Sequence, residues 1–147
     1  MLSLVCAQAL GDGRLGPLLV TAPEQVINQA SGILADAPAG ALSLKVGDAR
    51  PFVETDAVLV VQSRYSSGPR DAVGTWEIHR VSRVLGTTVE LDSPLAHSFP
   101  GFDSQLVTLP EYTNVSVSSG GGLAAPKWNG SSGGVLVDMQ AQALGII

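Results

Sequence analysis

The residues best suited to chemistry in this chain are its two histidines, His79 and His97. A nucleophilic triad needs a Ser or Cys, a His base and a carboxylate. The alternating run that starts at Trp76 predicts a strand in which Trp76 and Ile78 share the buried face, so His79 points to the other, half-exposed face. His97 lies in a loop between two prolines, and neither histidine belongs to a spaced zinc-binding pair. We therefore expect no catalytic residue, no metal site, no cofactor and no enzyme activity.

Paired carboxylates are the second chemistry that the sequence offers. Glu77, Glu90 and Asp92 lie on the two arms of one predicted hairpin, where cross-strand neighbours could act as the acid pair of a glycoside hydrolase. The alternative is that these carboxylates lie on the solvent face of a sheet, where charged residues normally lie, and we favour this interpretation.

Carboxylates in turns could bind calcium. Asp12, Asp36 and Asp48 lie in or beside glycine-containing turns, but the D-x-D-x-D-G pattern of a calcium loop is missing. Asp also favours turns without a metal, because its side chain bonds the nearby backbone.

Two aromatic residues could form a platform on which a sugar ring stacks. Tyr112 follows Pro110, and Trp128 lies in a Pro-Lys-Trp-Asn-Gly segment. Packing in the core or at a strand edge is the alternative for both residues. We retain Tyr112 and Trp128 as candidate glycan-binding residues.

The composition of the chain describes a β-protein with few charges. Of its 147 residues 45% are hydrophobic and 14% charged, with 17 Gly, 9 Pro and a net charge of −5. So many Gly and Pro residues disfavour long helices, and eight scattered basic residues disfavour nucleic acid as a partner. The single Cys6 excludes an internal disulfide, and no apolar run is long enough to span a bilayer.

The front of the chain predicts short strands. Residues 18–21, 41–46 and 57–62 read as strands, the last one covered on both faces because it is continuously apolar. Residues 25–34 fit either a helix or two short strands, and we expect strands. A hairpin with a Gly86-Thr87 turn and a bulge near Arg80-Val81 follows the polar loop 63–74.

The last third alternates short Val/Leu runs with Gly, Ser and Asn clusters. Strands are expected near 106–109, 115–117, 123–125, 135–139 and 144–147. Their spacing fits a sandwich or meander, and equally the first coils of a parallel β-solenoid. The prediction is an all-β chain, in which a β-sandwich or meander front module runs into a β-solenoid-like start. We expect a single domain over residues 1–147, and a sub-boundary at 93–104 is the alternative.

The ends of the chain are apolar and strand-like. Unpaired strand edges favour pairing with another chain. We therefore expect the segments containing Leu2 and Leu4, and Leu144 and Ile146, to act as assembly edges.

The chain also resembles a known family. Five segments resemble the N-terminal module of large secreted and cell-surface proteins of gliding and other environmental bacteria. They are LGDGRLGPLLV, INQASGILADAPAGALSLKV, AVLVVQS, GTWEIHRVSRVLGTTVELDSPLAHSF and LVTLPEYTNVSVSSGGGLAAPKWNGSSGGVLV. The resemblance covers nearly the whole chain from Leu10. It implies a module that leads into Gly-rich repeats of the β-helix type, with a surface or fibre role. This chain has Thr55-Asp56 where that family usually has a Gly-Asp turn.

Three functions follow from these observations. The first is a non-enzymatic structural module, secreted or at the cell surface, that self-associates into a homo-oligomer, filament, surface layer or adhesive structure. The second is a virion decoration or fibre protein. The third is a module that binds or cleaves carbohydrate, with surface glycans as partners. None of them requires nucleic acid or a transmembrane segment.

Overall fold

The computed structural model describes residues 11–140 and 144–146, and their regular structure is β apart from one 3₁₀ turn at Arg70–Ala72. The all-β prediction is confirmed. The chain forms two compact units. The first joins the described residues up to Asn28 to Leu109–Pro126 and the segment from Gly134; the second consists of Gln29–Thr108 and Lys127–Gly133. Residues 93–104, the predicted sub-boundary, lie inside the second unit, and the single domain stays a prediction.

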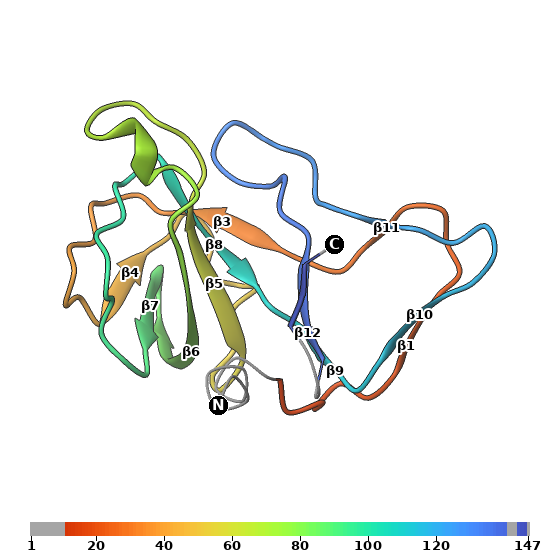
Figure 1. Ribbon diagram of the computed structural model, residues 1–147. Helices are drawn as coiled ribbons and strands as arrows, with labels where there is room; N and C mark the ends of the chain where they lie inside the picture. Colours follow the sequence, from red (N-terminus) through yellow and green to blue (C-terminus); the bar gives the residue numbers. More distant parts are fainter. Residues whose placement is uncertain (1–10, 141–143, 147) are drawn as a thin grey trace, which may run out of the picture. The chain divides into compact units, whose positions relative to one another are not determined.

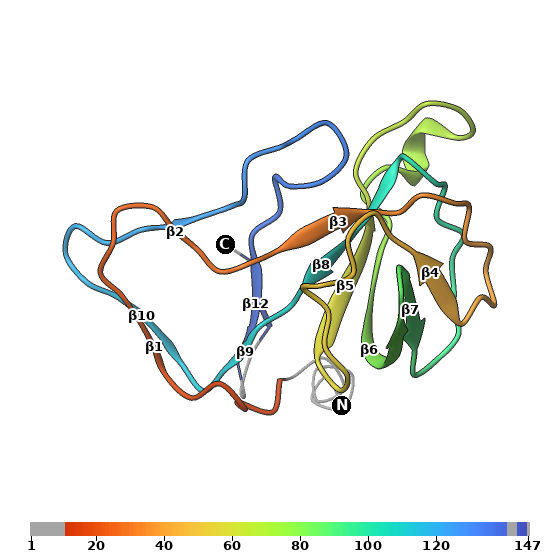
Figure 2. The same cartoon turned by 180° about the vertical axis from the view of Figure 1, so that it is seen from behind.

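The second unit is built on one six-stranded antiparallel sheet (Figures 1 and 2). Its strands follow in the order β3 (Ala30–Gly32), β8 (Ser104–Thr108), β5 (Ala57–Gln62), β6 (Trp76–Leu85), β7 (Thr88–Leu91) and β4 (Ser43–Lys45). An antiparallel bridge between Ile33 and Val46, the residues that directly follow the outer strands β3 and β4, brings the two edges together, so the sheet is curled like a barrel. The predicted meander is present in β5, β6 and β7.

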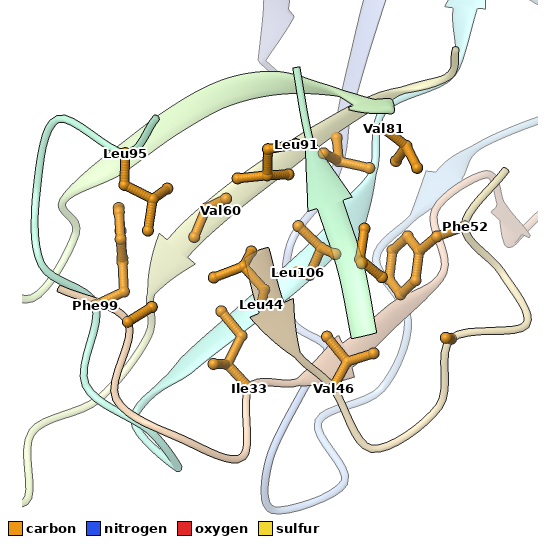
Figure 3. Packing of buried hydrophobic residues seen from close by; sticks show 14 residues of the cluster. Ile33, Leu44, Val46, Phe52, Val60, Val81, Leu91, Leu95, Phe99 and Leu106 are labelled. Carbon is orange, nitrogen blue, oxygen red and sulfur yellow. The ribbon is translucent and has the colours of Figure 1, made fainter. Parts of the chain in front are cut away.

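The core of the second unit fills the inside of this curled sheet (Figure 3). Val58 and Val60 of β5 point into it, and Ala57 and Leu59 on the other face are buried as well. The predicted strand at 57–62 is therefore covered on both faces. Leu44 and Val46 are buried as predicted, whereas Leu42, expected on the same face, is exposed because β4 begins only at Ser43.

The β6–β7 hairpin confirms the predicted turn and corrects the predicted face. Gly86 has φ +59°, and Leu85 pairs with Thr88, so the two-residue turn lies where the sequence placed it. The bulge lies between Val81 and Arg83, slightly beyond the predicted position. Trp76 is 48% exposed and His79 only 7%. The assignment of Trp76 to the buried face was wrong.

The first unit consists of short strands. They are β1 (Leu18–Val20), β2 (Gln25–Val26), β9 (Glu111–Tyr112), β10 (Val115–Val117), β11 (Leu123–Ala124), β12 (Val137–Gln140) and β13 (Leu144–Ile146). With β3, strand β2 confirms two short strands in the ambiguous segment 25–34.

Most strand pairs of the first unit are parallel. Strand β1 pairs with β10 and β2 with β11, so two segments far apart in sequence run side by side (Figures 1 and 2). Strand β12 pairs in parallel with β9, and β13 then returns antiparallel to β12. Parallel stacking of successive passes of the chain is the pairing found in a solenoid coil, which is one of the two arrangements that the spacing of the last third allowed.

Two glycines allow the two passes of the chain, residues 18–26 and 115–124, to lie close together. A Cβ on Gly121 would lie 2.5 Å from the carbonyl oxygen of Val20, and one on Gly122 would lie 2.6 Å from that of Pro23. The Gly122 N–H also donates to the carbonyl of Ala22. Gly121 and Gly122 are therefore required for this close approach.

The long connection between the two passes forms most of the second unit. Its ends lie together, because β3 and β8 are neighbours and the Thr108 N–H donates to the carbonyl of Gln29 at 2.8 Å. An insertion whose ends meet can leave and re-enter a coil at one place.

The predicted assembly edges are only partly described. Leu2 and Leu4 lie outside the described residues, as does Cys6. Leu144 and Ile146 belong to β13, the outer strand of the three-stranded sheet β13-β12-β9. Within the described part of the chain, no helix is long and apolar enough to cross a bilayer.

Candidate functional site

The two histidines of the chain converge on one carboxylate, that of Glu77. His79 Nε2 lies 2.8 Å from Glu77 Oε1, and His97 Nδ1 lies 2.7 Å from Glu77 Oε2. The backbone N–H groups of Ala96 and His97 donate to the same two oxygens. Strand β6 supplies Glu77 and His79, and the loop after β7 supplies the rest. Each carboxylate oxygen therefore receives two donors.

The hydrogen bonds of Glu77 also indicate which nitrogen of each imidazole ring carries a proton. A carboxylate only accepts, so His79 Nε2 and His97 Nδ1 carry protons. His79 Nδ1 lies 2.9 Å from Ser93 Oγ, and Ser93 Oγ lies 3.3 Å from an oxygen of Asp92. Ser93, His79 and Glu77 therefore follow one another in the order serine, imidazole, carboxylate, which is that of a nucleophilic triad.

This arrangement has a structural explanation. His79 is buried and the Glu77 side chain is only 10% exposed, whereas Ser93 and His97 are exposed on the loop that the carboxylate holds. Burial raises the pKa of Glu77, but the Ala96 N–H, the two imidazoles and the His97 N–H together hold that pKa below its usual value of 4.5. The cluster therefore fastens the 93–100 loop to β6.

The three carboxylates predicted as a possible acid pair have separate partners. Glu90 forms an ion pair with Arg83, whose guanidinium lowers the pKa of Glu90. Asp92 accepts the N–H of Arg80. With Glu77 occupied by histidines, the acid pair receives no support from these contacts.

The turn carboxylates bond nearby donors. Asp12 bonds Arg14, and Asp48 bonds Arg50, in each case through the arginine N–H and its guanidinium. The Arg50 side chain is the main cause that lowers the pKa of Asp48 to about 2. Asp36 accepts the Gly101 N–H. Among the described residues, no group of three or more His, Cys, Asp or Glu is arranged to hold a metal ion.

The two candidate glycan-stacking residues lie in different units. Tyr112 is half-buried in the first unit, and its pKa is raised by burial and by the charge of Asp138. Trp128 is 46% exposed in the second unit. Their role in glycan binding stays a prediction.

Trp128 precedes a tightly bonded turn. Asn129 Oδ1 accepts the N–H groups of Ser131 and Ser132. The buried Gln105 side chain bonds both the N–H and the carbonyl of Gly133. This turn is therefore fixed on the second unit with Trp128 at its exposed start.

A pocket of about 460 Å³ lies on the second unit, beside the polar loop 63–74. One wall is formed by residues 36–38 and 98–100, which an antiparallel bridge between Ala37 and Phe99 holds together. The loop residues Ser67–Pro69 and Ala72 form the other wall, and Gln62 also lines the pocket. The volume lies in the range of small-molecule sites.

Sequence reasoning missed both the Glu77 cluster and this pocket. The cluster was missed because the buried face of β6 was assigned from Trp76. Counting back from Val81, which pairs with the buried Leu91, places His79 and Glu77 on the buried face. No local pattern in the sequence indicates the pocket, because its walls come from separate loops.

Comparison with known proteins gives only distant likenesses. No family model matches, and no curated protein matches. Solved structures that match include the tailspike gp61 of Pseudomonas phage phi297, at 17% identity and a TM-score of 0.48 over 69% of this chain and 19% of that one.

Two further tailspikes match at a similar level. Gp54 of Acinetobacter baumannii bacteriophage AP22, in complex with A. baumannii capsular saccharide, is 12% identical with a TM-score of 0.42 over 71% of this chain and 23% of that one. Gp49 of Pseudomonas phage LKA1 is 14% identical with a TM-score of 0.43, over 70% and 22%. The chain spans about a fifth of the length of these proteins. Likenesses this distant transfer no site or activity to this chain.

Proposed function

We propose that this chain is a non-enzymatic structural module of an extracellular fibre or surface protein, whose first unit stacks with further β-coils. The observation that carries this proposal is the parallel pairing of β1 with β10 and of β2 with β11. Parallel passes stacked in register repeat the same backbone geometry at each step. A further pass can therefore be added by the same hydrogen bonds.

Open strand edges support the proposal. Among the described residues, β1 and β10 form a sheet of only two strands. The Leu18 N–H donates to the carbonyl of Asn114, and the carbonyl of Val20 accepts the Ser118 N–H. Because alternate residues of a parallel strand bond to opposite sides, the N–H and carbonyl of Leu19 face away from β10.

Exposed apolar side chains accompany these edges. Leu15, Leu19, Val26 and Val117 of the first unit all have more than half of their surface exposed. Apolar side chains beside unpaired backbone groups favour association with another strand. The second unit is formed mainly by the stretch of chain that connects the two passes.

The proposal includes both locations that the sequence predicts, a bacterial cell surface and a virion, because coil stacking operates in the same way in either. A gliding-bacterium surface protein is the form that the sequence resemblance suggests. A tailspike-like fibre is the virion form. In both cases another copy of the chain is the partner that the test addresses.

Light scattering as a function of concentration tests the proposal. We expect the wild-type chain to form oligomers whose mass rises with concentration. Leu19→Pro removes the outward N–H and should shift the protein toward the monomer. Leu19→Thr is the matched control, because it also loses the leucine side chain but keeps the N–H and the strand propensity, and it should associate more strongly than Leu19→Pro. A wild-type protein that stays monomeric at every concentration would contradict the proposal.

A further inference from the structure

The structural role proposed above does not involve the pocket beside loop 63–74. The pocket lies wholly within the second unit, whereas the coil edges belong to the first. Its volume of about 460 Å³ accommodates a small organic molecule.

The polar groups of the pocket include both acceptors and donors. Gln62 is 2% exposed, its Nε2 donates to the carbonyl of Arg64, and its buried Oε1 has no hydrogen-bond partner among residues 11–140 and 144–146. Buried polar atoms are nearly always paired, so an unpaired oxygen on a pocket-lining residue indicates a missing donor. Ser98 Oγ accepts the Ala39 N–H, which leaves its hydroxyl proton to donate.

The charge of the lining restricts the class of ligand. Among the described residues, the lining contains one carboxylate, Asp36, and no Lys, Arg or His. One oxygen of Asp36 already accepts the Gly101 N–H. Phosphate, sulfate and carboxylate ligands lack the cation that they need here, whereas hydroxyl groups find acceptors in Asp36 and Gln62.

The remaining lining is apolar. Prolines 38, 69 and 100 and alanines 37 and 72 line the pocket together with Phe99, which is only 1% exposed. Such walls suit the C–H faces of a saturated ring and offer no exposed aromatic face for a flat base.

The loop that forms one wall is held in shape before any ligand binds. The carboxylate of the buried Asp103 bonds the Ser66 N–H and hydroxyl, and it lies 3.4 Å from Arg64 Nε. The Arg64 side chain also donates to the carbonyls of Phe102 and Gly130. A fixed wall reduces the entropy lost on binding.

We propose that this pocket binds a neutral saccharide of one or a few rings. The hydroxyl groups of the sugar bond to Gln62, Asp36 and Ser98, and its apolar faces pack against the proline and alanine walls. The site is distinct from the Tyr112 and Trp128 platform considered from the sequence.

Titration of the ¹⁵N-labelled full chain with neutral sugars, followed by NMR, tests this proposal. The probes are glucose, galactose, mannose, rhamnose, N-acetylglucosamine and N-acetylgalactosamine. We expect at least one sugar to cause saturable shifts confined to the amides of residues 36–37, 67–68, 72 and 98–99. The absence of saturable shifts with all six sugars would overturn the proposal.

Two neighbouring substitutions give the matched control. Ala72→Trp fills the pocket and should raise the Kd at least about tenfold. Val73→Trp adds the same bulk at an exposed position of the same loop that does not line the pocket, and it should leave the Kd unchanged. Equal effects of both, in proteins whose spectra show the native fold, would contradict a site in this pocket.

Two further measurements test the contribution of Gln62 to binding and the chemical class of the ligand. Gln62→Leu removes the unpaired oxygen and should weaken binding several-fold while the spectrum of the rest of the barrel is kept. Putrescine and inorganic phosphate are the charged probes. Saturable binding of either in this pocket, with no response to the sugars, would overturn a neutral saccharide as the ligand.

Discussion

At the scale of single residues, Glu77 shows how a cluster with the composition of a catalytic site can serve structure. Its two oxygens accept hydrogen bonds from two backbone N–H groups and two imidazoles. The loop that contains Ala96 and His97 also bonds β6 through Ser93 and His79. Removing the carboxylate charge should therefore loosen the loop rather than abolish a reaction.

The Glu77 cluster predicts a specific dependence of stability on pH. Because the pKa of Glu77 in the folded protein lies below its usual 4.5, the stabilising effect is present above about pH 4.5 and is lost as the pH falls through the lowered value. Glu77→Gln should reduce the free energy of unfolding at pH 7 by about 1–3 kcal/mol, because an amide nitrogen would face a donor N–H. The difference from wild type should shrink below pH 4. Denaturant unfolding at several pH values measures both effects.

Glu90→Gln is the control for this measurement. Glu90 also has a lowered pKa, through Arg83, but the pair is accessible to solvent, so the substitution should change the stability much less than Glu77→Gln does. If Glu77→Gln were as mild as Glu90→Gln at every pH, Glu77 would not fasten the loop.

At the scale of elements, the turn that leads into β5 contains a residue in an unfavourable conformation. Thr55 has φ +73°, a left-handed conformation that β-branched residues rarely adopt. The turn is fixed from both sides, since the Thr55 N–H donates to the carbonyl of Val81 and Arg80 donates to that of Thr55. The neighbouring bonds therefore impose this conformation on Thr55.

Replacing Thr55 with glycine should stabilise the protein. Glycine adopts this φ without strain, and the gain should be about 1 kcal/mol after the larger entropy of the unfolded glycine is subtracted. Thr87→Gly is the matched control, because Thr87 lies in an exposed turn with an ordinary φ and should lose stability. Thermal unfolding of both variants measures the difference. A lower Tm for Thr55→Gly than for wild type would show that no strain resides there.

The elements were largely predictable from the sequence, and their faces were not. Short apolar runs between glycines located nearly all the strands because turn chemistry is local. The face of β6 depended on where one bulge interrupts the alternation, and placing that bulge slightly too early turned Trp76 inward and His79 outward. The pairing of β1 with β10 joins segments that are far apart in the sequence, such as Leu18 and Val115, and only the tertiary fold determines it.

At the scale of the whole molecule, the two units have separate sets of stabilising contacts. All members of the large hydrophobic cluster belong to the second unit. Val20, which is fully buried, belongs to the first. The chain enters and leaves the second unit through the neighbouring strands β3 and β8, and we therefore expect this unit to open while β1 stays paired with β10.

Hydrogen exchange measured by mass spectrometry tests this independence. Leu106 is fully buried in the cluster, so Leu106→Ala should destabilise the second unit by about 2–5 kcal/mol. Exchange should accelerate in β5, β6 and β8 and stay unchanged in β1 and β10. Val20→Ala should give the reverse pattern. Equal acceleration of all strands by either variant would instead indicate one cooperative domain, as predicted from the sequence, because loss of packing at one place would then unfold both units together.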